Sequence, residues 1–478
     1  MALAFVVLML VLFGVSVFVH ELGHFLAAKA FGMEATVFSI GMGKAIWSRT
    51  IGRTRWQIGW LPLGGYVALP QLDPNSFLEG SAYQDRDEPL EDVAPWKKVV
   101  VAVAGAAGNM VFALLLGVVV WIGGRPASMD ELNGVVGAVA KESAAEEAGI
   151  LVGDVIESVN GKPVANWVEI VTEVALSSGE PATLGLARGD ERFEAKLPLE
   201  QSSWGTWMLP GVAGMDMCHV ASVIGGSSAE AAGLAPGDQI VAYGGQKVFS
   251  RAHLSSLVEA NGTAQAEIEV LRSGETVRAT VAAAYDEDSN RHLIGVVFNT
   301  VGDLDYAVRS HPTPWKQIGS HVTSIVQFLR ALVTPKTAGS AAGAVGGPVS
   351  IFVMLYLMVK ASFMLALWFT GFLNVNLAII NLLPLPVLDG GHVVLNLWAW
   401  VTRRPVSARV VNVLANVFAL LLIALFIFLS FRDCRRQLWP MVKGAWTSAP
   451  AEVVDEDAEE PATEEAPAAS VSDEATAP

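Results

Sequence analysis

The stretch FVHELGHFLAAKAFG, residues 18–32, determines how the rest of this chain is interpreted. It closes an apolar segment in which no charged residue occurs between Met1 and Val19. Ionisable side chains in the hydrocarbon core of a membrane cost at least ~2.5–3.5 kcal/mol each on insertion scales. His20, Glu21 and His24 therefore indicate a functional site inside a membrane helix.

The composition predicts a membrane protein rather than an ordinary soluble enzyme. Of the 478 residues, 52% are hydrophobic and only 16% are charged. Ten carboxylates in residues 451–478 account for most of the net charge of −16, and nothing in the charge suggests nucleic acid binding. Cys218 and Cys434 lie far apart and predict neither a disulfide framework nor a metal site.

Four segments are long and apolar enough to cross a membrane, at about residues 3–31, 99–122, 361–383 and 410–431. The first could instead be a signal peptide cleaved after residues 28–30. It lacks a basic start, however, and carries two histidines and a glutamate where such a segment should finish. We therefore expect a polytopic α-helical membrane protein with four transmembrane helices.

The distribution of Lys and Arg predicts the orientation of these helices. Residues 33–98 hold seven of these side chains and residues 402–409 hold three, so both segments are expected in the cytoplasm. Arg432, Arg435 and Arg436 argue for the opposite orientation, and we follow the larger set. The N-terminus and the region between the second and third helices are then expected outside.

Residues 124–300 lose the apolar runs and contain a repeat at an offset of 84 residues. AGILVGDVIESVNGKPV at 148–164 aligns with AGLAPGDQIVAYGGQKV at 232–248. The shared glycines suit tight turns, and Asp154 and Asp238 can hold those turns. The pattern resembles the PDZ domain, in which a bound peptide adds a strand. Two α+β spacer domains that bind no peptide are the alternative.

His20 and His24 stand at positions i and i+4, so on a helix both imidazoles project from one face toward a common ion. Glu21 lies about 100° further round the helix and can act as general base on water beside that ion. Gly23 leaves room on this face for an approaching backbone. A pair of buried histidines packed between helices is the alternative.

A catalytic zinc typically takes three protein ligands, so a third ligand is expected on a distant helix. The stretch NLLPLPVLDGGHVV, residues 381–394, supplies Asp389, the only carboxylate within forty residues on either side. Pro384 and Pro386 are expected to break the helix, which is tolerated at membrane depth where protein or water satisfies the backbone. His392 is a rival ligand, and an Asp389 in an ordinary loop is the non-functional alternative.

HELGH in the first span, N-x-x-P-x-P-x-L-D-G in the third and the repeat between spans two and three together resemble one family. It is the site-2 protease family of intramembrane zinc metalloproteases (peptidase M50), in its bacterial RseP-like branch with tandem PDZ domains. The resemblance covers roughly residues 1–440. It implies one catalytic Zn²⁺ held by His20, His24 and Asp389, Glu21 as the catalytic base, and Asn381 as a residue that holds the substrate backbone.

The resemblance also implies that RWQIGWLPLGGYVAL, residues 55–69, forms a membrane re-entrant β-hairpin that pairs with an unwound substrate segment. Apolar side chains alternate from Trp56 to Trp60, and Gly64–Gly65 can form a turn. Trp60, Gly64 and Gly65 are therefore candidate substrate-binding residues. A surface hairpin is the alternative.

The second span departs from the family pattern, because GAAGNMVF (105–112) has Ala106 where the family usually has proline, while Asn109 remains.

Residues 312–333 predict an amphipathic helix at the membrane interface. The acidic tail is expected to be disordered. The predicted domains are transmembrane helix 1 with HExxH (1–32), the cytoplasmic and hairpin region (33–96), transmembrane helix 2 (97–123), two extracytoplasmic PDZ-like domains (130–205 and 206–300), the linker with the interfacial helix (305–345), transmembrane helix 3 with NxxPxPxLDG (346–401), transmembrane helix 4 (402–432) and the tail (433–478).

The resemblance implies an intramembrane zinc endopeptidase of the bacterial inner membrane with its active site near the cytoplasmic side. Its substrates would be single-pass membrane proteins, such as an anti-sigma factor or a remnant signal peptide. The PDZ-like pair, acting as a size filter, would require prior trimming by an upstream site-1-type protease. The alternative function is a membrane-anchored PDZ adaptor with a vestigial metal site, which would not need an intact set of metal ligands. An ion or metal transporter would need a polar path through several spans.

Overall fold

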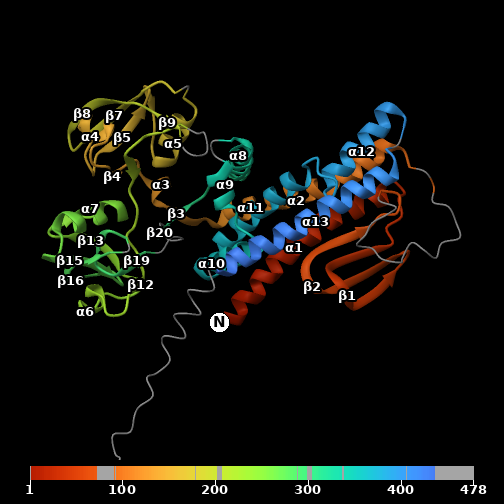
Figure 1. Ribbon diagram of the computed structural model, residues 1–478, viewed down its shortest axis with the longest axis horizontal. Coiled ribbons are helices and arrows are strands. Elements are labelled where there is room, and N and C mark those ends of the chain that lie inside the picture. The colour runs from red at the N-terminus through yellow and green to blue at the C-terminus, as the bar shows by residue number, and fades with distance from the viewer. Residues whose placement is uncertain are drawn as a thin grey trace, which may run out of the picture.

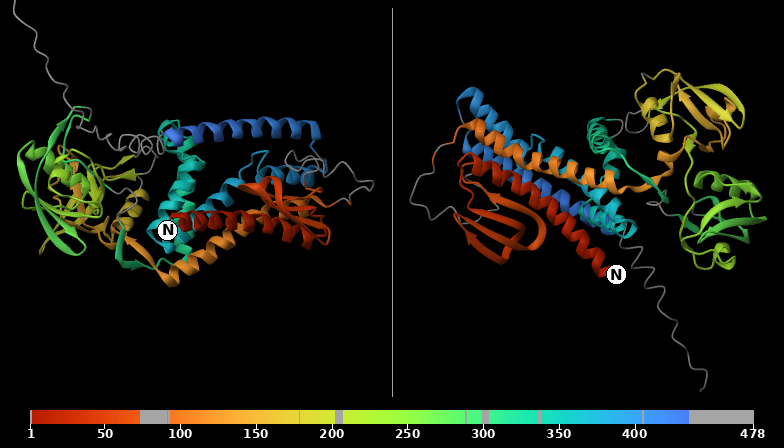
Figure 2. Two further views of the ribbon diagram at one scale, coloured as in Figure 1. Left: turned by 90° about the horizontal axis from the view of Figure 1, so that it is seen from below. Right: turned by 180° about the vertical axis from the view of Figure 1, so that it is seen from behind.

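The computed structural model places a helical bundle between two very different appendages (Figure 1). It describes residues 2–72, 91, 93–177, 179–201, 207–287, 289–298, 304–335, 338–404 and 406–435. Both repeat domains lie at one end of the bundle and a β-hairpin lies at the other, an arrangement that Figure 2 shows from two further sides. The predicted disordered tail lies outside the described residues beyond residue 435.

Four helices of the bundle are long and apolar enough to cross a membrane, and they match the four predicted segments. They are α1 (Ala2–Ala30), α2 (Pro95–Gly123), α11 (Phe363–Asn381) and α13 (Ala408–Asp433). A helix satisfies all of its backbone groups internally, which is what the bilayer core requires of a spanning segment. Because Pro95 is the first residue of α2, its missing N–H costs no intrahelical hydrogen bond.

The region predicted to hold transmembrane helix 3, residues 346–401, contains the span expected at about residues 361–383 and the predicted break after it. It folds as three helices, α10 (Pro348–Ala361), α11 and α12 (Asp389–Thr402). The predicted break at Pro384 and Pro386 is confirmed, because the chain between Asn381 and Asp389 is not helical.

Two glycines allow α12 to begin directly against the interrupted segment. A Cβ on Gly390 would lie 2.2 Å from the carbonyl oxygen of Leu383, and one on Gly391 would lie 2.4 Å from that of Leu385. Any side chain at either position would therefore push the start of α12 away. Close backbone packing fixes the place of Asp389, the first residue of α12.

The hairpin consists of β1 (Val37–Ile51) and β2 (Thr54–Ala68), and its turn lies at Gly52, where φ is +63°. The prediction that Gly64–Gly65 form the turn was wrong, since both lie inside β2. Residues 37–40 pair with both 65–68 and 55–58, so the hairpin curls into a small sheet. Residues 65–68 pair with residues 37–40 at an edge of this sheet.

The two repeat domains share one topology, with sheets ordered β6-β5-β7-β8 and β14-β13-β15-β16. The first domain contains β4 (Val136–Val139), α4 (Ala144–Glu147), β5 (Val155–Val159), β6 (Lys162–Pro163), α5 (Trp167–Ala175), β7 (Ala182–Arg188), β8 (Glu191–Leu197), β9 (Glu200–Gln201), β10 (Trp207–Met208) and β11 (Val212–Gly214). The second contains β12 (Val220–Val223), α6 (Ser228–Ala231), β13 (Gln239–Tyr243), β14 (Gln246–Lys247), α7 (Arg251–Asn261), β15 (Gln265–Arg272), β16 (Glu275–Ala282), β17 (Ala284–Asp286), β18 (Arg291–Leu293) and β19 (Val296–Phe298).

The boundary between these domains, predicted at residues 205/206, was wrong. Strand β11 pairs with β4, and Leu209 is buried in the core of the first domain. The first domain therefore includes the chain up to about Gly214. The second core begins with Cys218 and Val220.

The pair of domains joins the bundle through two short strands, β3 (Arg125–Ser128) and β20 (Leu304–Ser310), which pair antiparallel. Helix α3 (Met129–Leu132) follows β3, and the predicted amphipathic helix is α8 (Pro314–Val333), which follows β20. A short helix, α9 (Ala338–Ala344), leads from α8 to α10. Chain entry and chain exit of the repeat domains thus lie side by side.

The aspartates that the sequence repeat shares make the same contacts in both domains. In the second domain Arg272 binds Asp238 at 2.7 Å, and the N–H of Ala235 donates to the same carboxylate at 2.8 Å. In the first domain Arg188 binds Asp154 at 2.8 Å. Each aspartate side chain is only 1% exposed and holds the turn between the shared glycines.

We expect Asp238→Asn to loosen the second domain alone. The Arg272 guanidinium holds the pKa of Asp238 below its usual range. The stabilisation from the charged Asp238 side chain is therefore complete above pH of about 3.9, the pKa of aspartate in the unfolded chain. It is lost as the pH falls through the lower pKa that Asp238 has in the folded protein. Loss of the charged hydrogen bonds to Arg272 should speed hydrogen exchange in β15 of the full chain. Asp154→Asn is the matched control; unchanged exchange in β15 of Asp238→Asn would contradict the assignment.

Candidate metal centre

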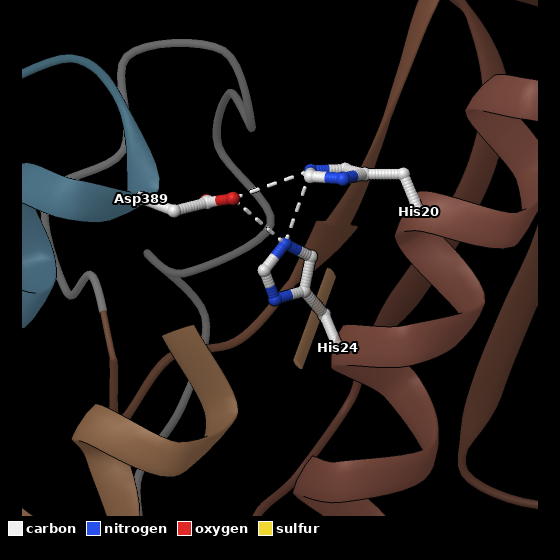
Figure 3. A group of neighbouring side chains, drawn as sticks. All are labelled: His20, His24 and Asp389. Atoms are coloured by element: carbon white, nitrogen blue, oxygen red, sulfur yellow. Dashed lines mark hydrogen bonds and ion pairs between the residues drawn. The ribbon is translucent and has the colours of Figure 1, made fainter. Parts of the chain in front are cut away.

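Three ligand atoms from distant parts of the chain converge inside the bundle (Figure 3). Nε2 of His20 lies 3.3 Å from Nε2 of His24, and Oδ2 of Asp389 lies 3.3 Å from each of these nitrogens. The histidines project from α1 and the aspartate from the first residue of α12. Among the described residues this is the one group of three or more His, Cys, Asp or Glu side chains that could hold a metal ion.

The distances fit a tetrahedral ion. Donor atoms 2.0–2.1 Å from a tetrahedral centre lie about 3.3–3.4 Å from one another, which is the spacing of all three pairs. Oδ2 of Asp389 is buried and accepts no hydrogen bond from the described residues. A buried carboxylate oxygen that faces two imidazole nitrogens without hydrogen bonding suits metal coordination better than a polar contact.

The group lies deep in α1, away from the repeat domains. At 1.5 Å per residue, His20 lies about 27 Å along the helix from Ala2, toward the end that carries the hairpin. His20, Glu21 and His24 are 9%, 8% and 6% exposed. An expensive set of polar side chains is thus buried at one place, as the sequence predicts.

Helix α2 approaches the histidines at glycine and alanine positions. A Cβ on Gly23 would lie 2.3 Å from the carbonyl oxygen of Ala104, which confirms the predicted room for a backbone. A Cβ on Gly105 would lie 2.2 Å from Nε2 of His24. This close contact lets the carbonyl of Val101 reach Nδ1 of His24 at 2.8 Å. Because Nδ1 then carries the proton, Nε2 keeps its lone pair for an ion.

Glu21 faces the edge of the hairpin. The N–H of Val67 donates to its carboxylate, and a Cβ on Gly65 would lie 3.2 Å from its Cγ. Strand β2 therefore brings backbone groups to the proposed general base. Of the predicted hairpin residues, Gly65 lies beside the site. Gly64, with φ of +75°, lies at an irregularity in the strand pairing.

The other predicted residues divide between the site and the surface. Nδ2 of Asn381, at the last position of α11, lies 3.3 Å from Nε2 of His20. Trp60 is 63% exposed, and its indole covers Gly43 rather than the metal-ligand group. His392 is not part of that group.

Two further buried amides lie in the bundle. The family pattern of the second span includes Asn109 but assigns it no contact, and Asn374 lies outside the motifs described above. Nδ2 of Asn109 in α2 lies 3.2 Å from Nδ1 of His20. Nδ2 of Asn374 in α11 donates to Oγ of Ser16 at 2.9 Å. Both asparagines are fully buried. For Asn374 a polar residue in an apolar helix is the sequence signal, and it does not identify the partner.

Two histidines and an aspartate at metal-ligand spacing, with a glutamate beside them, are the arrangement of a metallopeptidase. The model of peptidase family M50 matches residues 8–425, so this chain belongs to that family.

Curated relatives match nearly the whole chain. "Regulator of sigma-E protease RseP" of Escherichia coli (strain K12) is 28% identical over 89% of this chain and 97% of its own length. "Putative zinc metalloprotease" of Neisseria meningitidis serogroup A is 28% identical over 91% of this chain and 99% of its own length. Among solved structures, the PDZ domain of an SdrC-like protein from Listeria monocytogenes matches 19% of this chain and 92% of its own, with 19% identity and a TM-score of 0.16.

We expect Gly105→Ala to disrupt the metal centre without unfolding the bundle. The new methyl group would occupy the space of the His24 ring and displace Nε2 from the other two ligand atoms. Zinc bound per purified chain, measured by mass spectrometry of the metal, should fall about 10-fold or more.

Gly14→Ala is the matched control, because a Cβ there meets nothing within 4 Å and alanine favours the helix by about 0.8–1.0 kcal/mol. A Gly105→Ala protein that keeps the zinc content of the control would show that the contact with α2 does not position His24.

Proposed function

We propose that this protein is an intramembrane zinc endopeptidase that cleaves transmembrane segments of single-pass membrane proteins. The supporting observation is the set of three ligand atoms at 3.3 Å beside Glu21 in a helix apolar enough to span a membrane. His20, His24 and Asp389 would hold the ion and Glu21 would act as the catalytic base. A bound zinc acts as a Lewis acid that polarises a peptide carbonyl and makes water nucleophilic at neutral pH.

The carboxylate of Glu21 lies beside the ligand group, since it interacts electrostatically with His24, His20 and Asp389. It would therefore be within reach of a water beside that group. Glu21 takes the proton of the attacking water and delivers it to the leaving amine nitrogen. The hydrogen bond from Val67 orients the carboxylate before substrate arrives.

Substrate backbone would bind between the hairpin edge and Asn381. A peptide bond in an intact transmembrane helix is hydrogen-bonded and shielded, so the segment must first unwind. The edge at residues 65–68 can add an extended strand by β-augmentation. Asn381, adjacent to His20, would hold the next part of that backbone. In this arrangement the hairpin would re-enter the membrane.

The arrangement supports a direction of entry. The hairpin would lie on the cytoplasmic side of the bacterial inner membrane and the repeat domains outside, since they occupy opposite ends of the bundle. The paired domains would then exclude substrates with bulky outer portions. An upstream site-1-type protease would trim these first, as in regulated intramembrane proteolysis of an anti-sigma factor or clearance of a remnant signal peptide.

The test is cleavage of single-span membrane proteins truncated at their outer domains, co-expressed with the wild type or with Glu21→Gln. We expect cleavage by the wild type and a loss of at least ~10²-fold in Glu21→Gln, as for removal of a general base. A zinc chelator should have the same effect. Glu191→Gln, an exposed change of the same type in β8, is the control and should cleave normally.

Cleavage that persists in both Glu21→Gln and chelator-treated protein would contradict the proposal. A membrane-anchored adaptor with a vestigial metal site would keep its activity under both treatments, so the same experiment separates the two functions.

A further inference from the structure

Asn109 is the one polar residue among the buried side chains of α2, and its environment does not satisfy it. The residue is 0% exposed. Its Nδ2 lies 3.2 Å from Nδ1 of His20, whereas its Oδ1 is buried without a hydrogen-bond partner among the described residues. An amide in an apolar interior is costly unless its groups are bonded, so an orphaned oxygen beside a ring nitrogen requires an explanation.

The tautomer of the neutral His20 imidazole supplies that explanation. Its Nε2 faces Nε2 of His24 and Oδ2 of Asp389. When Nε2 gives its lone pair to an ion, the proton of the neutral imidazole must be on Nδ1, which then needs an acceptor. The amide nitrogen cannot accept, but the amide oxygen can. A half-turn of the Asn109 amide places Oδ1 where Nδ2 now lies. Since the oxygen and nitrogen of an amide are nearly equal in size, this half-turn needs no extra space.

We propose that Asn109 is the positioning residue of His20: in the metal-loaded protein its Oδ1 accepts the Nδ1–H of His20 and fixes the ring with Nε2 toward the ion. This inference rests on the metal centre of the proposed function. The carbonyl of Val101 does the same for His24, and both acceptors belong to α2. One helix without a metal ligand thus sets the tautomer of both histidines.

The rival explanation is that Asn109 only donates a hydrogen bond that ties α2 to α1. Substitution by aspartate separates the two, because an ionised carboxylate accepts from Nδ1–H but donates nothing, and carboxylate–histidine–zinc arrangements are common. Asn109→Leu removes both abilities. Asn374→Leu is the matched control, since Asn374 is equally buried and ties α11 to α1 through Ser16.

The experiment measures the zinc affinity of the purified full-length protein in detergent by competition with a chelator of known affinity. We expect Asn109→Leu to bind zinc about 10–100-fold more weakly than the wild type. Asn109→Asp should stay within a few-fold of the wild type, as should Asn374→Leu. Helical content measured by circular dichroism identifies any variant that does not fold.

Two results would overturn the inference: wild-type zinc affinity in Asn109→Leu, or equal weakening in the Leu and Asp variants. The proposed function fails separately. If the wild type binds zinc, loses it in Asp389→Asn and keeps it in Asn109→Leu, only the role of Asn109 is wrong. A wild type without zinc affinity would overturn the metal centre and this inference together.

Discussion

The structure depends on bringing a carboxylate from one end of the chain to two imidazoles from the other, inside the helical bundle. Asp389 lies 3.3 Å from both His20 and His24. At that depth it would be energetically costly to bury the carboxylate without the imidazoles, or the imidazoles without the carboxylate. Much of the surrounding geometry follows from this requirement. The prolines interrupt the third span, and Gly390 and Gly391 let α12 begin against the interrupted segment. After this local loss of helix, Asp389 at the start of α12 faces the histidines of α1.

Helix α2 has the second essential role, although it contributes no ligand. Its small residues bring its backbone into contact with α1, so that a main-chain carbonyl and a buried amide reach the far sides of the two histidine rings. A larger residue at Gly105 would occupy the space of the His24 ring. The orientation of this ring therefore depends on how closely α1 and α2 pack.

The sequence predicts those features that depend on local chemistry. The i, i+4 histidines, the isolated Asp389 and the helix break at the prolines each follow from residue type and spacing, and the structure brings them together. The predicted position of the hairpin turn was wrong because glycines at both 52 and 64 permit positive φ, and strand pairing decides between them. The predicted domain boundary was wrong because β11 pairs with β4, a strand much earlier in the sequence. The contacts of Asn109 and Val101 depend on the register of two helices, which no local pattern fixes.

The pairing of β3 with β20 has a consequence for the architecture of the chain. Ser128 lies opposite Leu304, so the polypeptide that leaves the bundle comes back to it one strand away. The bundle is thus topologically complete without the intervening repeat domains, which occupy the place of a simple connecting loop. Such an insertion point allows whole modules to be gained, lost or exchanged while the helices of the bundle keep their connectivity.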